Sequence, residues 1–117
     1  MISRAMTADA DLRDLIAAAE AFDSDYERDQ MPAYNAVLAH MQKHPAHRAD
    51  FGFMLLARLK EHGDGHLFMF CMGALKWPEV EAELRRWSDA SASETDKRPH
   101  FFYASCLRCF DPNYEFP

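Results

Sequence analysis

Glycine and proline are scarce in this sequence, with four and six residues in a chain of 117. An all-β domain needs many tight turns, which favour these two residues, so their scarcity argues against that class. Strong helix formers (Ala, Leu, Met, Glu and Arg) are plentiful instead. Hydrophobic residues make up 49% of the chain, enough for one core. We therefore predict a single all-helical domain over residues 1–117.

Long apolar segments are also missing. The longest near-continuous run, Leu67 to Trp77, has eleven residues and is interrupted by Lys76, whereas a membrane-spanning helix needs about 20. The first residues, MISRAMTADADLRDL, lack the apolar region of a secretory signal. The three cysteines are an odd number and do not resemble a disulfide framework. These absences predict a cytoplasmic, reducing setting and no membrane contact.

The sequence contains no G-x-S-x-G, Walker A, G-x-G-x-x-G or H-E-x-x-H motif. Residues 23–29, DSDYERD, alternate acids as a calcium loop does. An EF-hand needs Gly at the sixth place and Glu at the twelfth, where this chain has Arg28 and Tyr34. Arg85-Arg86 is no more than a doublet of basic residues, and no basic–aromatic stripe accompanies it. We therefore expect no enzymatic activity, no cofactor and no nucleic-acid partner.

Charge is distributed unevenly along the chain. The formal net charge is −6, and residues 9–29 hold eight acids and two bases, while the rest of the chain holds eleven of each. One segment therefore carries the whole net charge. A field of this sign repels nucleic acid and attracts basic proteins.

Apolar residues recur at three- and four-residue spacing after Thr7, a candidate N-cap; they are Leu12, Leu15, Ile16, Ala19 and Phe22. Pro32 and Pro99 suit the first turn of a helix, and Pro45 and Pro78 end one helix and open the next. The predicted helices are residues 8–28, 32–43, 46–62, 66–76, 79–89 and 99–110. The polar stretch SDASASETDKR, residues 88–98, is predicted to be an exposed, mobile loop.

Three stretches share a pattern and end on prolines 33 and 34 residues apart: QMPAYNAVLAHMQKHP (30–45), GDGHLFMFCMGALKWP (63–78) and KRPHFFYASCLRCFDP (97–112). Their junctions HPAHR, WPEVE and DPNYE resemble the helix–Asp-Pro-x-Val–helix turn of HEAT-like repeats. Only Asp111-Pro112 carries the Asp-Pro pair, and only Val80 matches the Val. The resemblance implies a compact stack of antiparallel helical hairpins, a short α-solenoid of a kind that mostly binds proteins.

Two sets of residues offer ligand or redox chemistry. His40, His44 and His47 are spaced by four and three, as on one helix face, but Pro45 is expected to break that helix. Cys106 and Cys109 form C-x-x-C near the end of a predicted helix, where the helix dipole disfavours thiolate. We interpret these cysteines, and Cys71, as buried apolar residues. A small metal-binding or redox protein using His40, His44, Cys106 and Cys109 is the alternative function.

The favoured function is a non-enzymatic, acidic protein-binding module with a basic protein partner. Its sharpest form is an inhibitor or immunity protein that neutralises a basic effector such as a nuclease toxin. Tyrosine among acids, and aromatics on a proline-bound C-terminal tail, suit partner contact; the candidate residues are Asp23, Asp25, Tyr26, Glu27, Asp29, Tyr114 and Phe116. Tyr114 and Phe116 are alternatively expected to cap the end of the stack. A self-associating structural protein, as a homodimer, is a further alternative.

Overall fold

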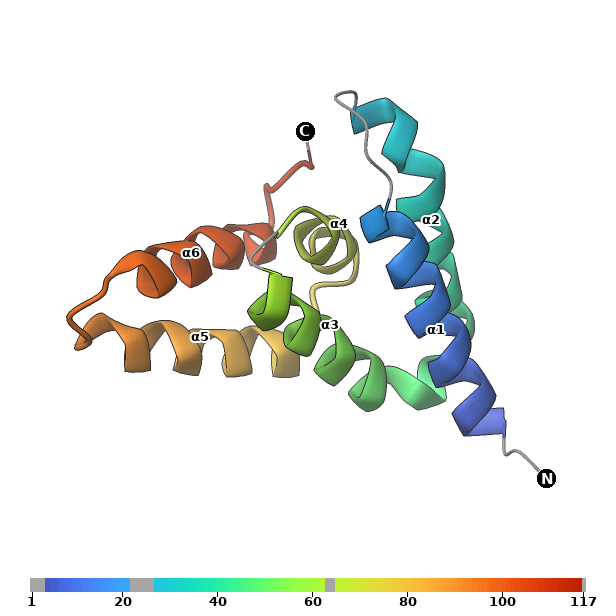
Figure 1. Cartoon of the computed structure of the whole chain (residues 1–117), viewed down its shortest axis with the longest axis horizontal. Coiled ribbons are helices and arrows are strands. Elements are labelled where there is room, and N and C mark those ends of the chain that lie inside the picture. The colour runs from blue at the N-terminus through green and yellow to red at the C-terminus, as the bar shows by residue number, and fades with distance from the viewer. Residues whose placement is uncertain (1–3, 22–26, 63–64, 117) are drawn as a thin grey trace. The chain divides into compact units, whose positions relative to one another are not determined.

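A computed structural model describes residues 4–21, 27–62 and 65–116 of the chain (Figure 1). Within these ranges it has six α-helices, two short 3-10 helices and no strand, so the all-α prediction with six helices is confirmed. The elements are α1 (Arg4–Ala21), α2 (Glu27–Lys43), η1 (Pro45–His47), α3 (Arg48–His62), α4 (His66–Leu75), α5 (Pro78–Ala92), α6 (Arg98–Leu107) and η2 (Arg108–Phe110). None of these helices is both long enough and apolar enough to cross a bilayer.

Internal contacts divide the chain into two compact units, Met1–Leu55 and Leu56–Pro117, with the boundary inside α3. The prediction that the chain folds as a single domain stays a prediction.

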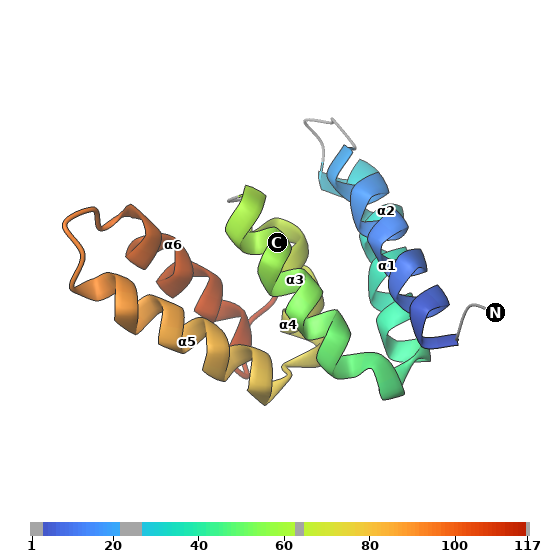
Figure 2. The same ribbon diagram turned by 60° about the horizontal axis from the view of Figure 1, so that its bottom comes forward.

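The first unit is built on a pair of helices, since α1 packs along α2 (Figures 1 and 2). The predicted apolar stripe of α1 faces inward, and Leu12, Ile16 and Ala19 are buried. The other side chains of this core are Ala8, Tyr34, Val37, Met41, Phe51 and Leu55. Leu15 is half-buried, and Phe22 lies outside the described residues. For the described part of the stripe, the three- and four-residue spacing identified the core face of α1.

Three predicted helix boundaries in this unit are wrong. The first helix begins at Arg4, so Thr7 lies inside it and is not its N-cap. The same helix ends at Ala21 and does not reach residue 28, because residues 27 and 28 already belong to α2. The second helix begins at Glu27, so Pro32 lies in its interior and not in its first turn. Glu27 and Asp29 precede that proline, and acids in a first turn are favoured by the helix dipole. This local preference places the start of α2 earlier than the proline alone indicates.

In the second unit, α4 is covered on several sides. Its inward residues Leu67, Phe68, Cys71 and Met72 are buried. The ring of Phe68 meets that of Phe110 in η2 edge-on, with centroids 6.2 Å apart. Contacts of this kind explain why residues 66–75 are apolar nearly all round, as the sequence predicted for a covered central helix.

A helical hairpin, α5 with α6, forms the other part of this unit (Figure 2). Pro78 and Pro99 lie in the first turns of α5 and α6, as predicted. The predicted loop 88–98 is wrong in its first half, because α5 continues to Ala92. Ser88 and Ser91 are buried in the α5 face that also holds Val80 and Leu84. Small hydroxyl residues in a polar stretch can therefore belong to a helix interface.

Hydrogen bonds satisfy these buried serines. The Ser91 hydroxyl donates to the carbonyl of Trp87 over 2.9 Å, one turn back along α5. The Nδ1 atom of His100 on α6 donates to the carbonyl of Ser88 over 2.8 Å. Because a backbone carbonyl only accepts, this bond fixes a proton on Nδ1 of His100. The Ser91 bond thus lies within α5, and the bond from His100 to the Ser88 carbonyl joins α5 to α6.

The junction prolines behave differently from one another. Pro45 opens η1 and Pro78 opens α5, so both start a helical segment. The stretch Asp111-Pro112-Asn113-Tyr114 instead forms a turn, in which the Tyr114 N–H donates to the Asp111 carbonyl over 3.0 Å. No helix follows this turn within the described residues. The repeat relationship between the three stretches stays a prediction.

Candidate functional site

The C-terminal aromatics lie against α4. Tyr114 and Phe116 are both half-buried, and the Phe116 ring meets the Phe70 ring edge-on with centroids 5.3 Å apart. A Cβ atom added to Gly73 would lie 2.9 Å from the Tyr114 ring, so that glycine is where the tail approaches the helix backbone. The tail aromatics therefore cover one side of α4. Their role as the cap of a repeat stack stays a prediction.

Lys76 holds this tail in place. It ends α4 in the left-handed conformation, with φ 50° and ψ 47°. Its ammonium group donates to the carbonyls of Cys109 over 3.0 Å and of Asp111 over 2.9 Å. The same group lies 5.9 Å from the centre of the Tyr114 ring. One side chain thus satisfies two carbonyls at the end of η2 and contacts the tail aromatic.

The acidic candidates are only partly described. Asp23, Asp25 and Tyr26 lie outside the described residues, and Glu27 and Asp29 lie in the first turn of α2, with side chains outside the description. The same acidic segment also supplies α1 with Asp11 and Asp14, which are exposed. The structure therefore adds two acids on the α1 surface to the predicted set.

The cysteines are buried and reduced. Cys71, Cys106 and Cys109 are all free thiols inside the second unit. Burial raises the pKa of Cys71 to about 12. Burial and the neighbouring Cys106 raise the pKa of Cys109 to about 12. A nucleophilic or metal-binding cysteine needs its thiolate form, so this environment opposes the redox alternative.

Histidine rings gather at the junction of α2 and α3. The helix breaks at Pro45 as predicted, yet the rings stay together across the break. The ring centroids of His40 and His44 are 4.6 Å apart, and those of His44 and His47 are 6.1 Å apart. The Phe51 ring lies 5.7 Å from His40 and 5.9 Å from His47. Four rings from three elements therefore form one cluster in the first unit.

Each histidine of the cluster has its own surroundings. His40 donates from Nε2 to the carbonyl of Ala8 on α1 over 2.9 Å, and since that carbonyl only accepts, Nε2 carries a proton. Partial burial lowers the pKa of His44 below its ordinary value, and His40, His47 and Lys43 lower it further. His40 is thus a structural link to α1, and the surroundings of His44 favour its neutral form.

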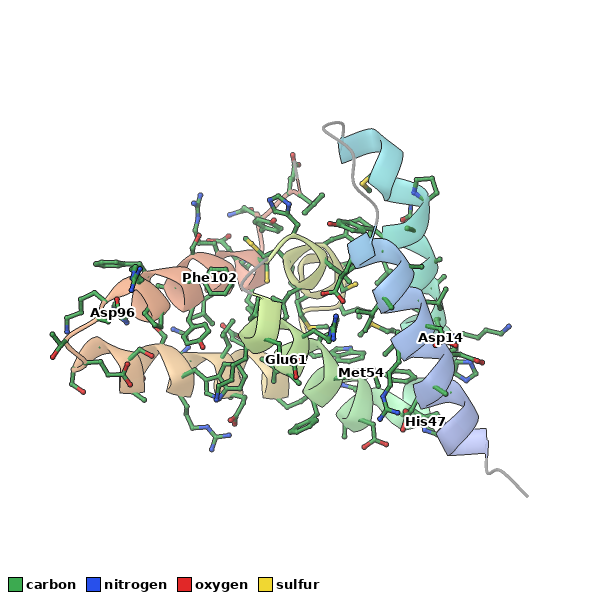
Figure 3. The ribbon with its side chains drawn as sticks, viewed as in Figure 1. Asp14, His47, Met54, Glu61, Asp96 and Phe102 are labelled. Carbon is green, nitrogen blue, oxygen red and sulfur yellow. The ribbon has the colours of Figure 1, made fainter. Side chains whose placement is uncertain are left out.

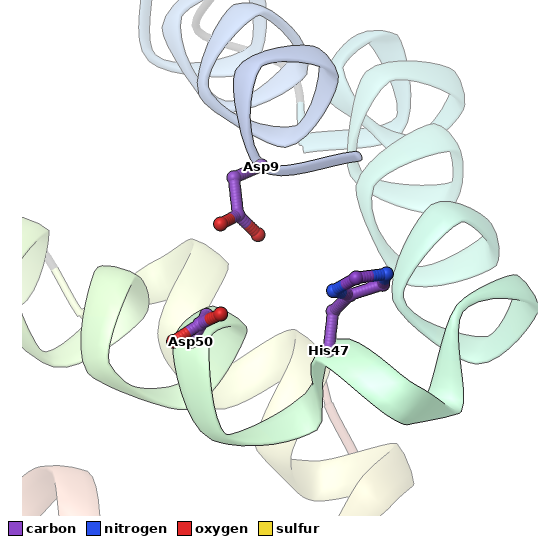
Figure 4. A group of neighbouring side chains, drawn as sticks. All are labelled: Asp9, His47 and Asp50. Carbon is purple, nitrogen blue, oxygen red and sulfur yellow. The ribbon is translucent and has the colours of Figure 1, made fainter. Parts of the chain in front are cut away.

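A different group of donors lies beside this cluster. Asp9 on α1, His47 in η1 and Asp50 on α3 each place one possible ligand atom within 4.8 Å of the others (Figure 4). Within the described ranges, no other set of three or more acids, histidines or cysteines has such spacing. The predicted alternative ligands His40 and His44 are not in it. The three residues offer two carboxylates and one imidazole, which are metal-binding groups.

Sequence reasoning missed this group for a clear reason. His47 and Asp50 are three residues apart, but one histidine and one acid at this spacing do not distinguish a metal site from ordinary surface residues. Asp9 is 38 positions before His47 and reaches it only through the packing of α1 on α2 and η1. No local pattern reports a contact of that range.

The described surface has other features without a defined ligand. A wide depression of about 560 Å³ is lined by α5, α6 and the turn after η2, and it mixes bases such as Arg85 and Arg108 with acids such as Glu81 and Asp89. Phe53 and Phe101 are 75% and 66% exposed. Single exposed aromatics of this kind are ordinary on protein surfaces.

Comparison of the chain with protein-family models, with curated proteins and with solved structures finds no match.

Proposed function

We propose that this chain is a non-enzymatic binding module that holds a basic protein partner on its acidic N-terminal segment. One observation carries the proposal: the whole net charge of −6 lies in residues 9–29. Opposite charge on a partner would steer association and fix its orientation. The sharpest form of the proposal is an inhibitor that covers the basic surface of an effector such as a nuclease toxin.

The geometry of the described residues supports this use of α1. Leu12, Ile16 and Ala19 are buried in the first unit, so the opposite side of the same helix faces solvent. That side carries Asp11 and Asp14, both exposed. Alanines 10, 17 and 18 are exposed beside them, and their small side chains leave the helix surface open to a partner.

The charge of the segment provides a direct test. The variant replaces Asp11, Asp14, Asp23, Asp25 and Asp29 by asparagine, and a control replaces exposed acids of the second unit: Asp89→Asn, Glu94→Gln, Asp111→Asn and Glu115→Gln. Untagged protein captures partners from host lysate at low and high salt, and titration calorimetry with the purified partner follows. Loss of five opposite charges is expected to weaken binding at least tenfold, about 1.4 kcal/mol, and to flatten its salt dependence.

The control variant should bind as the parent protein does. Equal weakening in both variants would show that overall charge, and not this segment, governs binding. Unchanged affinity and salt dependence in the N-terminal variant would end the proposal. If the lysate yields no partner and light scattering shows that the chain is a dimer, the self-associating alternative is favoured.

A further inference from the structure

We propose that Asp9, His47 and Asp50 form a binding site for a divalent transition-metal ion, with Zn²⁺ as the best-fitting cation. The site joins α1, η1 and the first turn of α3, and all three residues belong to the first unit (Figure 4). Asp9 is one of the eight acids of residues 9–29, but the variant that tests partner binding leaves Asp9, His47 and Asp50 unchanged. The two proposals therefore stand or fall separately.

Asp9 supplies an observation independent of the spacing. Its Oδ1 atom is buried and has no hydrogen-bond partner. A buried polar atom without a partner costs free energy, and buried carboxylate oxygens in proteins are normally hydrogen-bonded or bound to a metal. Figure 4 shows the Asp9 carboxyl group directed toward the space beside His47 and Asp50. A cation in that space would supply the missing partner.

The distances suit a site that closes on its ion. Donors around Zn²⁺ lie about 2.0–2.2 Å from the metal, which places them roughly 3.5 Å from one another in a tetrahedron. The three donors here lie within 4.8 Å of one another. Closure therefore needs movements of about an ångström, which rotation of the Asp50 side chain can provide because it is exposed.

The donor set selects the type of metal. Ca²⁺ and Mg²⁺ take oxygen ligands almost exclusively, whereas an imidazole with carboxylates suits Zn²⁺ and its first-row neighbours. Three protein ligands leave at least one position for water or for an external group. The site is half-buried at Asp9 and His47 and exposed at Asp50, so an ion and its water can enter from solvent.

Neighbouring contacts hold two of the ligands in position. The bond from His40 to the Ala8 carbonyl fixes the α1 backbone next to Asp9. The Phe51 ring, which is buried, lies 5.9 Å from the His47 ring and limits how that ring can turn. Fixing of the ligands before the ion arrives raises metal affinity.

Titration of metal-free protein tests the site. Untagged protein is treated with chelator, exchanged into buffer and titrated with ZnCl2 in a calorimeter at pH 7.5. One equivalent should bind with Kd below about 10 μM, and the melting temperature should rise by several degrees because ligands that bind only the folded state stabilise it. Asp9→Asn, His47→Gln and Asp50→Asn should each weaken binding at least tenfold.

Matched controls separate this site from adventitious binding. His44→Gln removes an adjacent imidazole and Asp11→Asn removes an adjacent α1 carboxylate, and neither should change Kd more than twofold. Circular dichroism of each metal-free variant reports its folding, and Asp50→Asn, at an exposed position, is the variant least able to disturb the fold. Three results would each overturn the proposal: no saturable Zn²⁺ binding below 100 μM, equal loss in the controls, or unchanged affinity in Asp50→Asn.

Discussion

At the scale of single residues, Lys76 shows how one side chain can offset an unfavourable backbone. Among the non-glycine residues that the structure describes, Lys76 alone has a positive φ angle. This conformation costs an L-residue about 1 kcal/mol. Glycine normally takes this place at a helix end. The hydrogen bonds from the Lys76 ammonium group to two carbonyls offset the cost of this backbone conformation.

Lys76→Met should remove both hydrogen bonds and keep the strained backbone. We expect a loss of about 1–2 kcal/mol in the free energy of unfolding, since each bond contributes about 1 kcal/mol and one lies at an exposed site. Lys76→Gly also loses the bonds but relieves the backbone, so it should be about 1 kcal/mol more stable than Lys76→Met. Urea unfolding measures both, and equal stability of the two variants would contradict this account.

The approach of Tyr114 to Gly73 gives a second prediction at this scale. Alanine favours a helix over glycine by about 1 kcal/mol, but here its Cβ would lie 2.9 Å from the Tyr114 ring. Gly73→Ala should therefore stabilise a Tyr114→Ala background by about 0.5–1 kcal/mol and should destabilise or leave unchanged the parent protein. A double-mutant cycle by urea unfolding measures the difference. Additive effects would mean that the tail does not rest on α4.

At the scale of elements, the sequence predicted the helices better than their ends. Apolar spacing and the prolines at 45, 78 and 99 indicated six helices and three of their starts, because those signals are local. The extension of α5 to Ala92 was missed because Ser88 and Ser91 are polar residues whose burial depends on α6. The Asp9–His47–Asp50 group was missed for the same kind of reason, a contact between distant elements.

The connection between α5 and α6 carries a test of pH dependence. Asp96, at this connection (Figure 3), binds the backbone N–H and the guanidinium of Arg98, and these bonds lower the pKa of its carboxyl to about 2 from 3.8. Because the pKa of Asp96 is lower in the folded protein, its ionised carboxylate stabilises the fold at pH values above 3.8. This stabilisation is lost as the pH falls from about 4 to 2.

Carboxyl NMR titration of Asp96 should show its midpoint near pH 2. Asp96→Asn should remove the part of the acid sensitivity that arises between pH 4 and 2, and the effect on stability should be small because the pair is exposed. The exposed Asp89→Asn variant serves as the control. An Asp96 midpoint near 3.8 would show that the Arg98 bonds do not persist in solution.

At the scale of the whole molecule, the natural probes are distributed unequally between the two units. Both tryptophans and all three cysteines lie in Leu56–Pro117, whereas the histidine cluster lies in Met1–Leu55. Tryptophan fluorescence and thiol reactivity therefore report on the second unit alone. Circular dichroism reports on the helices of both.

A single-domain chain should unfold in one transition. Helix α3 runs through the boundary between the units, so unfolding of either unit would unwind part of it. We expect urea curves from tryptophan fluorescence and from circular dichroism to coincide. Separate urea transitions would instead show two domains.

We also expect Cys71 and Cys109 to react with a disulfide reagent at pH 8 only as fast as the protein unfolds, because the pKa of each is about 12.

The short turn at Pro45 has a consequence for how this chain tolerates insertions. Positions 40, 44, 47 and 51 are spaced by four, three and four residues, and their rings lie together although the helix is broken at the turn. Connections between helices usually accept extra residues. One residue added between His44 and His47 would change the direction in which α3 leaves the turn. Phe51 would then lose its contact with His40, and His47 would move away from Asp9. This connection should therefore be fixed in length, even where its sequence is free to vary.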